Sequence, residues 1–207
     1  MLSSLLPAVV GALIFATAGV CGTLAAIAIL PKLKRFDDGP APVDVHPALL
    51  VAGAALLGAV LGWRRIPNPE FITAALATVP LIAVWYCDAR TGIVPDLFTL
   101  LPLVLAIAYE TYLHQPWAAV LSAAVLFAPF AVGALLSRGR GMGWGDAKLA
   151  AFGGALLGMR DALLAFGIAS LAAVIAGAVR NRSKSVPIVF APYLVAAIGI
   201  AIAVAAK

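Results

Sequence analysis

Long apolar stretches alternate with short polar or Pro/Gly-rich breaks along the chain. Most of these stretches hold 16 to 20 residues, close to the length of about 20 that a helix needs to cross a bilayer. Backbone groups in lipid must be paired within the structure, which favours helices. The pattern therefore predicts an all-α fold, a polytopic membrane helical bundle of about eight transmembrane or membrane-dipping segments. These are residues 5–30, 48–63, 71–87, 97–113, 117–136, 147–159, 161–179 and 187–206.

Composition supports a membrane protein with the lipid bilayer as a partner. Of 207 residues, 64% are hydrophobic and 11% charged, whereas a soluble domain is about a quarter charged. The net charge of +5 comes from basic residues scattered through the breaks, so no nucleic-acid partner is expected. The length suits one membrane-embedded domain, residues 1–207.

The basic residues also predict an orientation. If the eight segments cross alternately, ten Lys and Arg residues fall on one side and four on the other. The positive-inside rule makes the richer side cytoplasmic, with both termini outside and an inner (cytoplasmic) membrane location. Arg64 and Arg65 are on the wrong side for this rule. The apolar run that continues to Leu30 favours a retained span over a cleaved signal peptide.

Two aspartates lie beside apolar segments on the predicted cytoplasmic side, at Asp88 and Asp146. Acids at membrane depth are costly and usually functional. Asp146 follows Gly141, Gly143 and Gly145, which we expect to adopt positive φ and to let a substrate strand approach closely. The segment after Asp146 is short, about 20 Å of helix against a core of about 30 Å, so either this aspartate is recessed or the helix dips without crossing.

Two carboxylates that face one water suit peptide hydrolysis. One, ionised, takes a proton from water while the other, protonated, donates to the scissile carbonyl, and the pair titrates as a unit. We expect no metal and no cofactor, because the serines lack a Gly-x-Ser-x-Gly context and the cysteines and histidines have no metal-binding spacing. Asp96 is interpreted as a helix cap, and Lys148 as a solvated charge or an orienting group.

The motifs around these aspartates resemble the type IV prepilin peptidase family, a group of membrane aspartyl leader peptidases with a Gly-x-Gly-Asp motif. The first motif is Asp88 followed by Val-Pro-Asp at 94–96 and Leu-Phe-Thr at 97–99, and the second is Gly-Met-Gly-Trp-Gly-Asp-Ala-Lys-Leu at 141–149. A third, Pro-Ile-Val-Phe-Ala-Pro-Tyr at 187–193, has Ala191 where the family has glycine. The likeness covers roughly residues 71–206, which form the expected peptidase core. Residues 1–70 would add two less typical spans and a cytoplasmic loop.

The resemblance implies that Asp88 and Asp146 are the catalytic pair. It also implies that the substrate is a prepilin or pseudopilin, cut on the cytoplasmic side just before its hydrophobic helix. Family members that methylate the new terminus carry paired Cys-x-x-Cys motifs in the first loop. Residues 31–47 contain no cysteine, so the short form is expected to be a peptidase with doubtful N-methyltransferase activity.

Three other classes stay open. A small proton- or ion-coupled transporter could use the same two aspartates, although no inverted repeat is visible. A presenilin-like protease shares the Gly-x-Gly-Asp motif, but Tyr86 is offset from Asp88 and the only Pro-Ala-Leu, at 47–49, lies far upstream. A structural membrane subunit would leave the glycine-rich acidic motif unexplained. Substrate identity and oligomeric state are not predicted.

Overall fold

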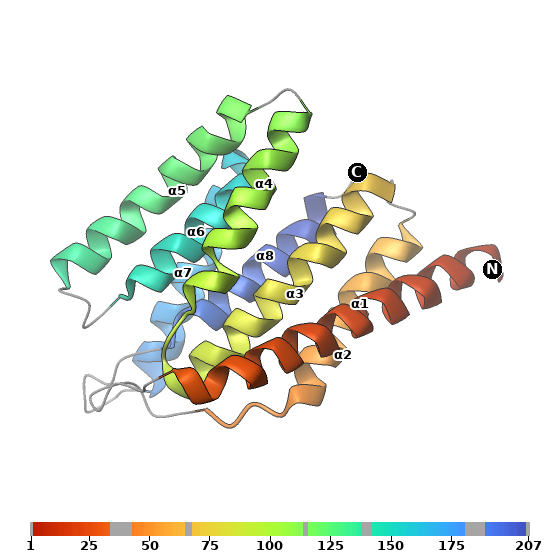
Figure 1. Cartoon of the computed structure of the whole chain (residues 1–207), viewed down its shortest axis with the longest axis horizontal. Coiled ribbons are helices and arrows are strands. Elements are labelled where there is room, and N and C mark those ends of the chain that lie inside the picture. Colours follow the sequence, from red (N-terminus) through yellow and green to blue (C-terminus); the bar gives the residue numbers. More distant parts are fainter. Residues whose placement is uncertain are drawn as a thin grey trace.

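The computed structural model describes residues 2–33, 43–64, 68–113, 116–137, 142–180 and 189–205. Within these ranges the chain forms α-helices, two 3-10 turns and no strand (Figure 1), so the all-α prediction is confirmed. The elements are α1 (Leu2–Ile29), η1 (Leu30–Lys32), α2 (Pro47–Trp63), α3 (Asn68–Thr91), η2 (Asp96–Phe98), α4 (Leu100–Tyr112), α5 (Pro116–Leu136), α6 (Trp144–Leu157), α7 (Met159–Arg180) and α8 (Ala191–Ala205).

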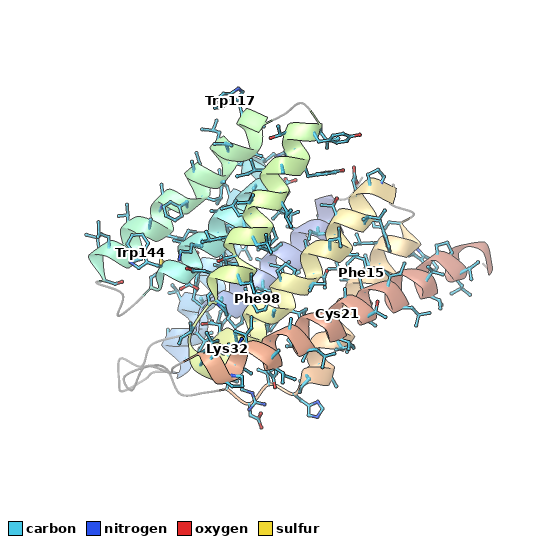
Figure 2. All side chains as sticks on the ribbon, viewed as in Figure 1. Phe15, Cys21, Lys32, Phe98, Trp117 and Trp144 are labelled. Atoms are coloured by element: carbon cyan, nitrogen blue, oxygen red, sulfur yellow. The ribbon has the colours of Figure 1, made fainter. Side chains whose placement is uncertain are left out.

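Long apolar helices with outward-facing apolar side chains identify a multi-pass membrane protein. Four described helical stretches are long and apolar enough to cross a bilayer, namely Leu5–Lys32, Pro69–Thr91, Trp117–Leu136 and Met159–Val179, and two shorter ones, Pro47–Trp63 and Ala191–Val204, are also apolar. Large apolar side chains are exposed on the outside of the bundle, including Leu13, Leu56 and Ile168. Figure 2 shows side chains projecting outward all around the helices. Water would penalise such a surface, whereas lipid accommodates it.

Successive helices run up and down the bundle, so alternate connections gather at one end. α1, α3, α5 and α7 finish at this end, and α2, α4, α6 and α8 begin there (Figure 1). We call it the site end. Lys32 lies at the site end, whereas Trp117 lies at the opposite end (Figure 2). The largest buried cluster joins residues from Ala26 in α1 to Ile198 in α8.

α6 is the most enclosed helix, and it packs against α4, α5, α7 and α8. Most of the helix from Asp146 to Ala155 is buried. The small side chains of its many alanine and glycine residues allow the neighbouring helices to pack this closely. α6 begins at Trp144, three residues earlier than expected, and ends where Gly158 takes φ +76°. Gly154 packs closely against α5, because a Cβ atom there would lie 2.7 Å from the carbonyl oxygen of Ser122.

Arg64 has a structural role that the charge pattern did not suggest. Its Nη1 atom donates hydrogen bonds to the carbonyl oxygens of Ala203 and Val204, in the last turn of α8. The final carbonyls of a helix lack partners and carry partial negative charge, so a guanidinium there is stabilising. This contact explains one basic residue on the predicted outer side. Arg65 lies outside the described residues.

Candidate active site

Asp88 lies in the last turns of α3, inside the helix rather than just beyond the end predicted at residue 87. Its side chain is buried, with 5% of the residue exposed. One carboxylate oxygen, Oδ2, accepts a hydrogen bond of 3.2 Å from the backbone N–H of Ala191, the first residue of α8. The unpaired N–H groups and positive dipole of a helix N-terminus favour such an acceptor. α8 therefore contributes directly to the environment of Asp88.

Ala191 replaces the glycine that the resemblance led us to expect. Its contribution is a main-chain N–H, which any residue except proline supplies. The additional methyl group is accommodated, because Ala191 is fully buried among the core residues. The substitution therefore leaves this contact with Asp88 intact. Pro187 and Ile188, the first residues of the same motif, lie outside the described residues.

Asp146 lies in the first turn of α6 and is 8% exposed. Its Oδ2 accepts a hydrogen bond of 3.2 Å from the N–H of Gly143, the residue that precedes the helix. A carboxylate in the first turn that reaches back to this N–H is the acidic half of a capping box. The bond fixes the carboxylate at the site end, beside the connection between α5 and α6.

The two aspartates form a pair of buried acids. α8 packs against both α3 and α6, and Gly145, the residue before Asp146, lies against Val94, six residues after Asp88. Among the described residues, both salt bridges involve other acids, Asp44 and Asp96. Two buried carboxylates without a cationic partner are costly to keep. Both residues that the sequence singled out are thus buried at the same end of the bundle, although they are far apart in the chain.

The described glycines of the second motif act differently from the expectation of positive φ. Gly143 has φ −85°, and Gly145 lies within α6. The described positive-φ glycines are Gly92 and Gly158. Gly145 allows α6 to approach the residue Val94 closely, because a Cβ atom at position 145 would lie 2.5 Å from Cβ of Val94. The close neighbour is the chain's own 92–99 connection, which holds α6 against the end of α3. Gly141 lies outside the described residues.

Asp96 does not cap a helix, which corrects the sequence interpretation. It begins the 3-10 turn η2, whose N-cap is Pro95, and α4 has Thr99 at its N-cap. The Asp96 carboxylate instead pairs with Lys148 of α6, at 2.5 Å between Oδ1 and Nζ. The pair joins the residues after Asp88 to the helix that carries Asp146. Being partly exposed, it contributes about 0–1 kcal/mol at most, so its main effect is on position.

Arg90 is held by residues that sequence analysis did not select. Its Nη2 lies 2.7 Å from Oδ1 of Asp44, and its guanidinium lies 5.4 Å from the ring centre of Tyr86. Next to this contact, the N–H of Val43 donates to the carbonyl of Ala89 at 2.8 Å. These contacts attach the chain before α2 to the last turns of α3, on either side of Asp88. The charge pair Asp44 and Arg90 was the available signal, but 46 positions separate them in the sequence.

No group of three or more His, Cys, Asp or Glu side chains able to hold a metal ion occurs in the described ranges. The arrangement at the site end consists of two buried carboxylates, each oriented by a main-chain N–H. Such a pair can exchange protons with a bound water and with a substrate carbonyl.

Comparison with known proteins identifies the family. A model of the type IV leader peptidase family matches residues 75–178. A "Prepilin leader peptidase/N-methyltransferase" of Aeromonas salmonicida (strain A449) is 33% identical over 165 residues, which cover 74% of this chain and 56% of that protein. The Aeromonas hydrophila protein of the same name is 30% identical over 165 residues, covering 74% and 57%. The Pseudomonas putida protein of that name is 29% identical over 170 residues, covering 77% and 59%.

The chain spans a little over half the length of these curated relatives. No solved structure gives a significant match. The matched family and relatives are peptidases, so the transporter alternative gains no support. The family match covers half of the chain and runs from α3 to α7, the part that carries both Asp88 and Asp146. The protein belongs to the type IV leader peptidase family.

Proposed function

We propose that the protein is an aspartyl endopeptidase that removes the leader of a prepilin or pseudopilin, with Asp88 and Asp146 as the catalytic pair. The observation that carries the proposal is the placement of two buried carboxylates at the same end of the bundle, Asp88 in the last turns of α3 and Asp146 in the first turn of α6. Membership of the family and the names of the relatives support the substrate class. The peptidase core would be residues 71–206 within a single domain of residues 1–207.

The proposed reaction needs one proton shared between the two acids. The ionised aspartate removes a proton from a water molecule, whose oxygen attacks the scissile carbonyl carbon. The protonated aspartate donates its proton to the carbonyl oxygen, which yields a neutral tetrahedral intermediate. When this intermediate collapses, the C–N bond breaks, the amine receives a proton and the carboxyl product leaves. Like charges in a buried site disfavour double ionisation, which keeps the pair in the required state.

The proposal includes an orientation and a location. The site end would face the cytoplasm in the inner membrane, with both termini on the other side. The excess of Lys and Arg in the connections at the site end supports this orientation. A leader that extends from a membrane-held substrate into the cytoplasm would then meet the two aspartates at the membrane surface.

We propose peptidase activity without N-methylation. The relatives bear both activities in their names, whereas the cysteines of this chain are Cys21 and Cys87, neither in the first loop. Incubation of a processed pilin with radiolabelled S-adenosylmethionine tests this part. Transfer of the labelled methyl group by the wild-type protein, above the level of a membrane control, would overturn it.

The peptidase proposal is tested by co-expressing a candidate prepilin with the wild type, Asp88→Asn or Asp146→Asn and following leader removal by gel shift. Asparagine keeps the shape but removes the proton chemistry, so each variant should lose at least about 100-fold in rate, the usual contribution of acid–base catalysis. Glu70→Gln is the matched control, because Glu70 is an exposed acid in the first turn of α3, far from Asp88.

Membrane levels of all variants are compared by immunoblot. Cleavage by either asparagine variant at the wild-type rate would remove that aspartate from the mechanism. Failure of the wild type to process any prepilin in a panel would remove the substrate class.

A further inference from the structure

The outer face of α7 and α8 contains an apolar groove that the leader peptidase proposal does not use. Its volume is about 410 Å³, and its lining residues run from Asp161 to Ala172 on α7 and from Tyr193 to Val204 on α8. Val204 lies eleven positions after Tyr193, which corresponds to about 16 Å of helix. Leu164 and Ile168 on its rim are mostly exposed, so the groove opens sideways toward the bilayer.

The groove leads to the candidate active site. Tyr193, at one end of the groove, lies two residues from Ala191, whose N–H binds Asp88. Asp161 and Val204 mark the opposite end, away from the site. A chain that lies in the groove and continues past Tyr193 therefore arrives beside the catalytic pair.

The lining of the groove suits a helix. Half of it is alanine, with Ala165, Ala169 and Ala172 on α7 and Ala196, Ala197 and Ala201 on α8. Small side chains allow the backbone of a third helix to approach closely, which is how helices associate in membranes, where burial of apolar surface alone gives little driving force. The remaining lining is almost entirely apolar.

We propose that the α7–α8 groove binds the apolar membrane helix of the substrate and thereby delivers the cleavage site to Asp88 and Asp146. The inference rests on the proposed function, in which the substrate is a leader-bearing protein held in the membrane by such a helix. Both aspartates are almost completely buried, so the substrate needs a defined approach. The groove is shorter than a membrane span of about 30 Å, so it holds the part of the substrate helix nearest the leader and leaves the rest in lipid.

Disulfide cross-linking tests the occupant. Ala196→Cys places a thiol in the groove, and Ala128→Cys places one on an exposed position of α5 as the matched control. Both carry Cys21→Ser, because Cys21 is exposed, and Asp146→Asn, so that the substrate stays uncleaved. Prepilins with single cysteines along their apolar helix are co-expressed and the membranes are oxidised. We expect the thiol at position 196 to cross-link with prepilin cysteines in the part of the apolar helix nearest the leader. The thiol at position 128 should form no cross-link with the prepilin.

Filling the groove provides an independent readout on the active enzyme. Ala196→Trp should raise KM for full-length prepilin at least tenfold with little change in kcat, whereas Ala128→Trp should change neither. The fall in kcat/KM caused by Ala196→Trp should be at least tenfold larger for full-length prepilin than for a leader peptide without the apolar helix. A misfolded Ala196→Trp protein would lose activity on both substrates equally, so the comparison separates a docking defect from a folding defect.

The other outcomes overturn the docking proposal. A cross-link between two copies of the protein at position 196 would assign the groove to self-association. Equal cross-linking at 196 and 128, or none at 196, would leave the groove to lipid. These outcomes differ from failure of the proposed function, in which wild-type protein with its cysteines intact does not cut prepilin at all.

Discussion

At the residue scale, the site depends on groups that fix two carboxylates without neutralising them. Asp88 and Asp146 each accept one main-chain N–H, from Ala191 and Gly143. The nearby cations are engaged elsewhere, since Arg90 pairs with Asp44 and Lys148 pairs with Asp96. A cation bound directly to the pair would stabilise the doubly ionised state, which lacks the proton that the proposed reaction needs.

Gly145 is predicted to be the most sensitive glycine of the second motif. In Gly145→Ala the new Cβ meets Val94 at 2.5 Å, so α6 and the 92–99 connection must separate. A shift of about 1 Å in a catalytic group can cost about 100-fold, and we expect at least about tenfold slower leader cleavage.

The matched control is Gly143→Ala, where the nearest atom beyond the chain neighbours lies 3.6 Å away and φ is −85°. Gly143→Ala should slow leader cleavage clearly less than Gly145→Ala does. Replacing Val94 with glycine removes the atom that clashes, so the double variant should regain part of the lost rate. Equal losses in Gly145→Ala and Gly143→Ala would contradict the close-approach argument.

At the element scale, α6 is short because Gly158 ends it. Gly158 has φ +76° and ψ 164°, a region that residues with a side chain almost never occupy. The turn sends the chain directly into α7 at Met159. α6 is thereby limited to 14 residues, and Asp146 is buried in its first turn.

Gly158→Ala is therefore expected to destabilise the protein through backbone strain alone. No atom lies within 4 Å of an added Cβ, so a steric clash does not contribute. The expected loss is about 1–3 kcal/mol, measured as earlier thermal aggregation in detergent. Gly167→Ala is the control, because Gly167 lies in α7 with similar free space, and alanine there should be neutral or slightly stabilising. A Gly158→Ala protein as stable as the wild type would refute the role of this turn.

At the scale of the whole molecule, the up-and-down course of the helices brings the connections around both aspartates to one end. The ends of α1, α3, α5 and α7 and the starts of α2, α4, α6 and α8 all lie at the site end (Figure 1), and Trp117 lies at the other (Figure 2). Asp44 lies just before α2 at this end, and Val94 lies between α3 and η2. Under the proposed function, the orientation in the membrane therefore decides on which side a leader would be cut.

Thiol labelling tests that orientation. In a Cys21→Ser background, Asp44→Cys at the site end should react with a membrane-impermeant maleimide only after the cells are permeabilised. Trp117→Cys, 82% exposed at the opposite end, should react in intact cells. Gly53→Cys in the middle of α2 serves as the membrane-embedded control. Labelling of Asp44→Cys in intact cells would reverse the proposed topology.

The sequence by itself determined the helical membrane fold and marked Asp88 and Asp146 as the candidate catalytic acids, because both inferences follow from local rules. A run of apolar residues long enough for a bilayer must be helical, and an acid beside such a run is too costly to be incidental. The tertiary structure decided how the acids are held. Asp88 meets Ala191 and Gly145 meets Val94 only through packing between helices distant in the chain. The same packing shows why Asp96 binds Lys148 and Arg64 binds the end of α8, contacts that depend on geometry no local pattern records.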